Sequence, residues 1–125
     1  GHYPLHAPRQ YIERYRGRYD AGWDVVRAQR FARQHELGIV PAGAELAPRN
    51  PGIRPWADLS SAEQRLAARF MEVYAAFITH ADTQLGRLLD ELERRAGGGE
   101  LGSATALVAR KVRQACGQPR AWLLA

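Results

Sequence analysis

Residues 60–95, SSAEQRLAARFMEVYAAFITHADTQLGRLLDELERR, determine the fold expected of this chain. Apolar residues recur there at steps of three and four, a spacing that places them on one face of an α-helix. Ser60 and Glu63 have the spacing of a capping box, which starts a helix, and the glycines at 97–99 end it. The apolar stripe consists of Leu66, Phe70, Val73, Phe77, Ala81, Leu85, Leu88 and Leu92.

A helix over residues 60–95 would be roughly 50 Å long at about 1.5 Å per residue. A globule of 125 residues is too small to cover such a helix, so the stripe needs a partner surface. A sheet is the expected partner, because helices in α/β proteins bury their apolar side against one. No segment of the chain strongly predicts a strand that could build this sheet. The chain by itself is therefore expected to be mainly α-helical.

The N-terminal residues predict an extended segment followed by a short helix. Pro4 and Pro8 disfavour a helix over residues 1–9. The short helix is expected at residues 9–16, where apolar side chains share one face. Gly17 is expected to stop this helix.

A second helix is expected from an N-cap at Asp20 to Leu37. Gly38 then occupies the position at which a left-handed residue commonly ends a helix. The inner side of this helix is expected to be formed by Trp23, Val26, the aliphatic part of Arg30 and Leu37.

Residues 41–58 have the composition of a surface loop. Four of the seven prolines of the chain lie there, together with Gly43 and Gly52. Prolines in this number exclude a helix or a central strand, and they limit the flexibility of a loop. At 18 residues the loop is long enough to act as a lid or a wrap.

Composition limits the class of protein. The 125 residues suffice for one domain, and 46% apolar with 25% charged residues is ordinary for a globular protein. No apolar run approaches the roughly 20 residues that a membrane span requires. A single cysteine, Cys116, excludes an internal disulfide and a cysteine-rich zinc site. The N-terminus has neither Met nor a signal-like segment, so the chain is expected to start inside something longer.

The net charge of +5 is unevenly distributed. Residues 1–58 carry a net +3 and residues 59–101 a net −2, whereas residues 102–125 carry +4 with no acidic residue. A basic tail can contact nucleic acid or an anionic surface. Arginine outnumbers lysine 17 to 1, which codon usage explains better than phosphate recognition does, so nucleic acid is the less favoured partner.

Four histidines are the residues with most potential for chemistry. His2 and His6 have the i, i+4 spacing of a metal pair on a helix, but the prolines beside them exclude that helix. His35 is expected near the end of the second helix, where a protonated imidazole favours the helix dipole. His80 lies off the apolar stripe and is expected at the surface or rim. The sequence has no Ser/His/Asp set, phosphate-binding glycine loop or metal-ligand cluster.

Several segments resemble those of bacterial arylsulfatases of the sulfatase family, in the same order and with similar spacing. The resemblance covers about residues 1–101 and leaves the basic tail at 102–125 unmatched. It rests on HYPLHAP at 2–8, YRGRYDAGWD at 15–24, GIVP at 38–41, MEVYAA at 71–76 and LGRLL at 85–89.

The resemblance implies a fragment of an α/β fold related to alkaline phosphatase and hydrolysis of a sulfate ester, such as an aryl sulfate. It implies a catalytic role for His2, at the sulfate and the leaving-group oxygen, and none for the neighbouring His6. An imidazole suits that role, because it can donate a proton to a departing phenolate near neutral pH. For the intact enzyme it also implies calcium and a formylglycine, made from the Cys or Ser of a Cys/Ser-x-Pro-x-Arg signature.

The chain departs from the family pattern in three respects. It has no such signature, since Cys116-Gly117-Gln118-Pro119-Arg120 has its proline one place late. It lacks the family's metal-binding aspartates at the N-terminal side. After residue 101 it lacks the strand ending in an Asp-Asn pair, and the match stops where the charge changes, so a frame shift or a gene remnant is expected there. The chain alone is therefore expected to bind no cofactor and to be inactive.

Two other interpretations stay open. The chain can be a small helical interaction module, whose stripe binds a protein partner or whose tail binds nucleic acid. It can also be a fragment that docks onto a separately encoded remainder of a sulfatase. The family occurs in the bacterial cytoplasm and periplasm, so the resemblance leaves the compartment open.

Overall fold

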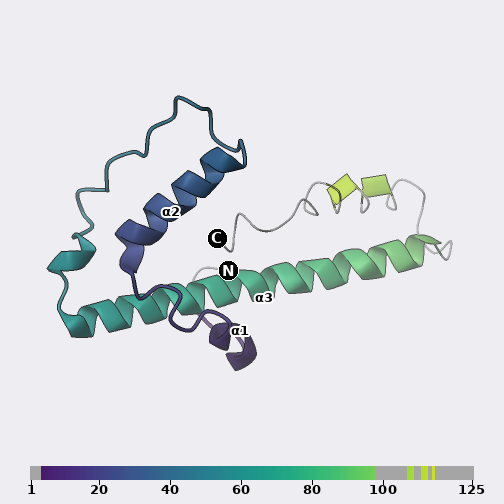
Figure 1. Cartoon of the computed structure of the whole chain (residues 1–125). Coiled ribbons are helices and arrows are strands. Elements are labelled where there is room, and N and C mark those ends of the chain that lie inside the picture. The colour runs from purple at the N-terminus through teal and green to yellow at the C-terminus, as the bar shows by residue number, and fades with distance from the viewer. Residues whose placement is uncertain (1–3, 98–106, 109–110, 113, 115–125) are drawn as a thin grey trace.

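The computed structural model of the chain describes residues 4–97, 107–108, 111–112 and 114 (Figure 1). Within residues 4–97 the helical elements are α1 (Arg9–Glu13), α2 (Gly22–Glu36), the 3₁₀ helix η1 (Trp56–Asp58) and α3 (Ser61–Gly97). None of the described residues forms a strand. The prediction of a mainly α-helical chain is confirmed for this part of the protein.

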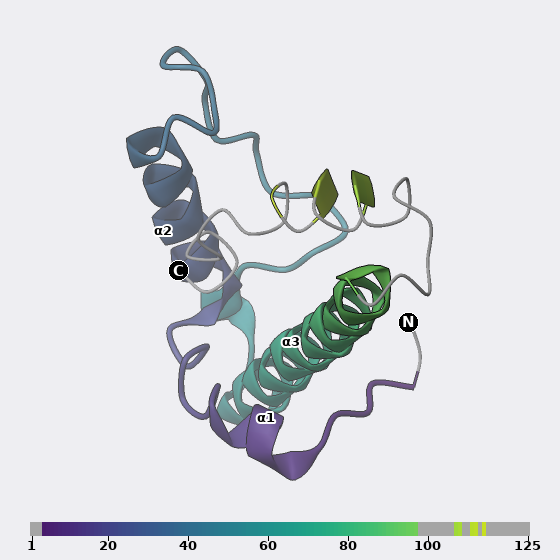
Figure 2. The same cartoon turned by 90° about the vertical axis from the view of Figure 1, so that its right-hand side faces the viewer.

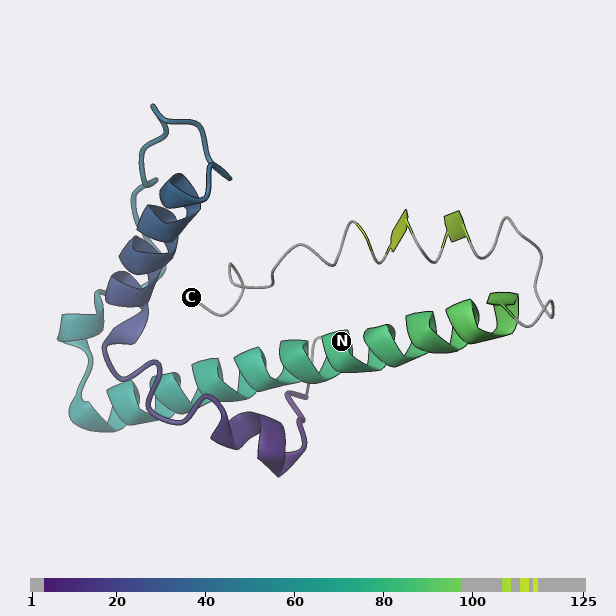
Figure 3. The ribbon, with the colours of Figure 1, turned by 45° about the vertical axis from the view of Figure 1, so that its right-hand side comes forward.

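Helix α3 is the rod to which the other elements attach. Its 37 residues begin at the predicted capping box, in which the Ser60 backbone N–H donates to Glu63 Oε2 at 2.8 Å and the Glu63 N–H to Ser60 Oγ at 3.3 Å. Helix α1 lies across one side of α3, and α2 stands on the other side near the N-terminal end of α3 (Figures 1 and 2). The C-terminal half of α3 projects beyond α1 and α2 (Figure 3).

The short helix α1 ends at Glu13, three residues before the predicted end. The backbone continues in tight turns instead, with Tyr15 N–H bonded to the Ile12 carbonyl and Arg18 N–H to the Tyr15 carbonyl, both at 3.0 Å. The C-cap of α1 is Arg14, so the prediction that Gly17 stops this helix is wrong. Gly17 lies within the turns instead, with a φ of +75°. The prediction of residues 1–9 as extended holds for the described residues 4–8.

Helix α2 begins at Gly22 with Ala21 as its N-cap, so the prediction of Asp20 as the N-cap is wrong. The reason is a close approach: a Cβ on Gly22 would lie 2.2 Å from a ring carbon of Trp56, and the φ of Gly22 is +84°. The helix starts where the backbone can pass under that ring. Sequence periodicity carries no information about this contact, because Trp56 lies 34 residues further along the chain.

The C-terminus of α2 ends as predicted. Gly38 has a φ of +66° and donates its N–H to the His35 carbonyl, while Ile39 N–H donates to the Gln34 carbonyl at 2.9 Å. This pair of bonds is the Schellman motif. Leu37 is 42% exposed, so its predicted place on the inner side is wrong: it is the C-cap, where the helical period no longer applies.

The chain packs against α3 on a face of small side chains rather than on the apolar stripe. Ala68, Ala76 and, further along, Leu89 are buried, as is Glu72, whereas Leu66, Phe70, Leu85 and Leu88 of the stripe are 46–60% exposed. The expectation that the chain cannot cover this helix is therefore confirmed for the described residues. No described helix is both long enough and apolar enough to cross a membrane.

Candidate functional site

His2, the predicted catalytic residue, lies outside the described residues. The segment that follows it, residues 4–8, has no regular secondary structure and leads into α1, where Pro8 accepts the Tyr11 N–H at 2.9 Å. His6 is exposed in this segment. The structure therefore defines what anchors the chain just after His2, rather than His2 itself.

Two tyrosines fix this N-terminal region to the middle of α3. Tyr11 and Tyr15 are 8% and 4% exposed, and they form a cluster with Ala76, which is fully buried. The Tyr15 hydroxyl and Thr79 Oγ1 are 2.5 Å apart. Ala7, five residues after His2, packs on the same cluster.

His80 is half-buried, where the sequence predicted a surface or rim position. Its ring lies edge-on to Tyr11, with ring centroids 5.0 Å apart and planes at 61°. The guanidinium of Arg14 lies 4.8 Å from the centre of the same tyrosine ring. His80 thus contributes to the packing of α1 on α3.

Glu72 holds the turn after α1 on α3. Its carboxylate is buried, accepts the Gly17 backbone N–H at 2.7 Å and accepts Arg69 Nη1 at 2.6 Å. A buried carboxylate is stable only when its oxygens are paired in this way. Sequence reasoning missed Glu72, because its only signal was its place inside MEVYAA, a segment used for the resemblance.

Asp24 holds the proline-rich loop on α2 through its carboxylate. It accepts the Trp56 backbone N–H at 2.8 Å and Arg49 Nη1 at 2.9 Å. These two donors, the Trp56 N–H first, lower the pKa of the Asp24 carboxyl. Sequence reasoning missed this residue too, since its partners lie 25 and 32 residues away.

The indole rings of Trp23 and Trp56 pack edge to face next to Asp24, with centroids 4.9 Å apart and planes at 83°. This contact joins α2 to η1 directly above Gly22. The Trp23 Nε1 atom is buried, and none of the described residues accepts its hydrogen bond. The aromatic contact thus carries a desolvation cost at that nitrogen.

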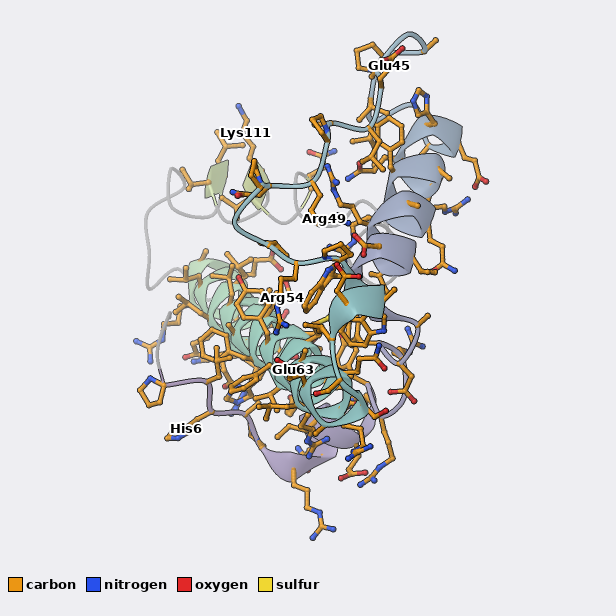
Figure 4. All side chains as sticks on the ribbon, turned by 90° about the vertical axis from the view of Figure 1, so that its left-hand side faces the viewer. His6, Glu45, Arg49, Arg54, Glu63 and Lys111 are labelled. Atoms are coloured by element: carbon orange, nitrogen blue, oxygen red, sulfur yellow. The ribbon has the colours of Figure 1, made fainter. Side chains whose placement is uncertain are left out.

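Side chains at both ends fasten the loop at 41–58 to the helices. His35 Nε2 lies 3.1 Å from the Ala44 carbonyl oxygen, and Arg27 donates to the Ala47 carbonyl. At the other end Arg54 pairs with Glu63 at 2.5 Å. The two labelled side chains lie next to each other in Figure 4. Arg54, together with the Ser60 donors of the capping box, lowers the pKa of Glu63 to about 2. The predicted loop is therefore a wrap with a defined course, and His35 has this contact besides its predicted place in the last helical turn.

A groove of about 1000 Å³ lies between α2, the loop and the start of α3. Its apolar lining includes Trp23, Val26, Phe31, Leu46, Ile53 and Met71. Among the described residues that line it are four arginines, Arg27, Arg30, Arg49 and Arg54, and one acidic residue, Asp24. Below we call this space the α2 groove.

No group of three or more His, Cys, Asp or Glu side chains in the described part of the chain is arranged to hold a metal ion. The described acidic residues of the site instead pair with arginines and backbone N–H groups, as Glu72 and Asp24 do. The described residues thus form two features: contacts that hold the N-terminal region and the proline-rich loop on the helices, and a groove lined by arginines.

Comparisons with known proteins place these features in a family context. No protein-family model matches the chain. An uncharacterised sulfatase of Schizosaccharomyces pombe is 42% identical over 93 residues, which are 74% of this chain and 17% of that protein. An arylsulfatase of Klebsiella aerogenes is 38% identical over 93 residues, which are 74% of this chain and 20% of that protein. The chain thus spans about a fifth of the length of these curated relatives. The resemblance seen in the sequence is confirmed: over about three quarters of its length the chain is homologous to one segment of the sulfatases.

Proposed function

We propose that the chain is one segment of a sulfate-ester hydrolase, with an aryl sulfate as the substrate class. The observation that carries this proposal is the 38% identity to an arylsulfatase over 93 residues. In this proposal the segment contributes an active-site histidine and a long helix that packs on the remainder of the enzyme.

The uncovered stripe on α3 supports the second part of the proposal. Leu66 and Leu88 are 60% and 55% exposed on the same helix, and large apolar side chains gathered in this way mark an interaction surface. The relatives are about five times longer than the matched segment, so they have ample polypeptide to cover such a face. We assign that covering polypeptide to the α/β fold, related to alkaline phosphatase, that the resemblance implies.

We assign His2 the role of acid at the leaving group. Its imidazole would donate a hydrogen bond, and then a proton, to the ester oxygen as the sulfur–oxygen bond breaks, so that a neutral phenol departs. The tyrosine cluster of α1 supports this assignment, because it anchors the chain five residues after His2 on a rigid helix. His6, the neighbouring histidine in the same segment, has no catalytic role in this proposal.

The formylglycine and the calcium ion implied for the intact enzyme do not fit the residues of this segment. The sequence has no Cys/Ser-x-Pro-x-Arg signature, and the described residues offer no group of ligands for a metal ion. We therefore assign the nucleophile and the metal ligands to the remainder of the enzyme. Because most catalytic stabilisation comes from such preorganised charged groups, the chain alone should be inactive.

A chimeric enzyme tests this function. The homologous segment of the Klebsiella aerogenes arylsulfatase is replaced by residues 1–97 of this chain, and hydrolysis of 4-nitrophenyl sulfate is followed by absorbance. The proposal expects the chimera to hydrolyse the ester and the 125-residue chain to give no turnover above buffer. Turnover by the chain alone would contradict the assignment of the nucleophile and the metal ligands to the remainder of the enzyme. A chimera with native-like circular dichroism but no turnover would contradict the assignment of the segment.

The second candidate is a helical interaction module, favoured by the same exposed stripe on α3 and by the basic composition of residues 102–125. DNA binding that weakens steeply with salt, and that disappears when residues 102–125 are removed, would support this module. The absence of such binding leaves the sulfatase segment as the function.

A further inference from the structure

The α2 groove combines an apolar floor with more positive charge than its own acids neutralise. Within the described part of the chain, Asp24 is the one acidic residue in its lining, against four arginines. Asp24 already pairs with Arg49. No residue of the segment 4–8 lines the groove, so the function proposed above does not use it.

Three of the arginines hold the groove together. Arg27 donates to the Ala47 carbonyl, Arg49 to Asp24 and to the Ile53 carbonyl at 3.1 Å, and Arg54 to Glu63. Each of these bonds ties the proline-rich loop to itself or to a helix. The walls of the groove are therefore set in advance, which reduces the cost of ordering them around a ligand.

Arg30 is the exception. It lines the groove from α2, and no described residue accepts a hydrogen bond from its guanidinium. Phe31 follows it in the sequence and lines the same groove, as do Trp23 and Met71. The groove thus offers an available planar cation next to aromatic and thioether surfaces.

We propose that the α2 groove binds a small organic anion with an apolar body, its carboxylate or sulfonate on Arg30 and its body against Trp23 and Phe31. A guanidinium binds such oxyanions through two parallel hydrogen bonds, which fixes their orientation. The volume of about 1000 Å³ is at the upper end of the range for small-molecule sites, so an aromatic body fits.

Calorimetric titration of the 125-residue chain with naphthalene-2-sulfonate tests this inference at about 0.15 M salt. Methyl 2-naphthyl sulfone, which is neutral and of similar shape, is the comparison ligand, and sodium sulfate is the anion without an apolar body. The sulfonate should bind with a Kd below about 1 mM, and the sulfone and the sulfate each at least about tenfold more weakly.

Arg30→Gln is the decisive variant, and Arg33→Gln is its matched control. Arg33 lies on the same helix, pairs with Glu36 at 2.8 Å and does not line the groove. The sulfonate Kd should rise about tenfold or more in Arg30→Gln and stay within about twofold in Arg33→Gln. Circular dichroism at 222 nm checks that both variants keep their helices.

Three results would overturn the inference. They are the absence of sulfonate binding up to several millimolar, equal affinities for the sulfonate and the sulfone, and equal losses in the two variants. The second result would make the groove a general apolar surface, and the third would make the binding a nonspecific effect of net charge.

Discussion

The carboxylate of Glu72 accepts the backbone N–H of Gly17 at 2.7 Å, across 55 residues of sequence. Gly17 has the left-handed conformation and lies within the turns that follow α1, so this bond fixes the course of the N-terminal region on α3. The same carboxylate is only 5% exposed and also binds Arg69. Glu72 is therefore the residue that connects the packing of α3 to the segment that carries His2.

Replacement of Glu72 should destabilise the chain more than replacement of an exposed glutamate. Glu72→Ala removes a part-buried hydrogen bond between the Gly17 N–H and a charged carboxylate, and we expect a loss of about 1.5 to 3 kcal/mol in the free energy of unfolding. Glu13→Ala removes only an exposed pair with Arg16 and should lower the free energy of unfolding much less. Urea denaturation followed by circular dichroism measures the free energy of unfolding of both variants. Equal losses would mean that the Glu72 contact stabilises the chain no more than an exposed ion pair does.

Gly22 and Gly38 both have positive φ angles, but only Gly22 lies against another side chain. A Cβ would lie 2.2 Å from the Trp56 ring at Gly22 and would meet nothing within 4 Å at Gly38. Gly38→Ala should cost about 1 kcal/mol, from backbone strain alone. Gly22→Ala should cost at least about 2 kcal/mol more, because the ring must also move. Thermal unfolding compares the two variants, and a similar effect of both would contradict the close approach of Trp56 to α2.

Two adjacent leucines on α3 differ in burial, because one lies on the buried side of the helix and the other on the exposed apolar stripe. Leu89 is 8% exposed and Leu88 is 55% exposed. We expect Leu89→Ala to lower the free energy of unfolding of the 125-residue chain by about 2 kcal/mol or more, and Leu88→Ala by less than about 0.5 kcal/mol. In the chimeric arylsulfatase, where the stripe is covered in our proposal, Leu88→Ala should become destabilising as well. A Leu88 variant that is neutral in both proteins would argue against a covered stripe.

The pKa of Glu63, lowered to about 2, predicts acid sensitivity at the start of α3. The carboxyl has an ordinary pKa of 4.5 when unfolded, so the stability that it contributes is complete above pH 4.5 and disappears as the pH falls towards 2. Glu63→Gln should therefore reduce the difference in melting temperature between pH 5 and pH 2.

Glu45→Gln is the control for this pH experiment. Glu45 is an exposed loop residue, away from Arg54 and Glu63 in Figure 4. Its replacement should leave the pH dependence of the melting temperature unchanged. An identical acid response of the wild-type chain and the Glu63 variant would show that the capping box and Arg54 do not stabilise the folded state.

The sequence was sufficient for the elements whose signals are local. The capping box and the three-and-four spacing predicted α3, and Gly38 predicted the end of α2. The N-cap of α2 could not be predicted in this way, because the position of Gly22 depends on a distant tryptophan. The contacts of Glu72 with Gly17 and of Asp24 with Arg49 were missed for the same reason, since each joins residues at least 25 positions apart.

The buried face of α3 shows a different limit of sequence reasoning. Periodicity identified the most apolar stripe, yet within the described residues the buried side chains of α3 are those of Ala68, Glu72, Ala76 and Leu89. Leu66, Phe70, Leu85 and Leu88 of the stripe stay exposed. Small side chains allow α1 to approach closely, and the large apolar ones remain available for a surface that the described residues do not provide. For His2 the pattern of residues gave no chemical role, and the assignment rests on the resemblance to arylsulfatases.

Hydrolysis of 4-nitrophenyl sulfate by the chimeric arylsulfatase with His2→Gln, compared with His6→Gln, shows whether His2 acts in the active site. We predict that His2→Gln lowers kcat about 100-fold or more, because general acid catalysis contributes at least this much. We predict that His6→Gln leaves kcat within about threefold of the unmodified chimera. Equal kcat values for the two variants, with both proteins folded, would contradict the account and remove His2 from the active site.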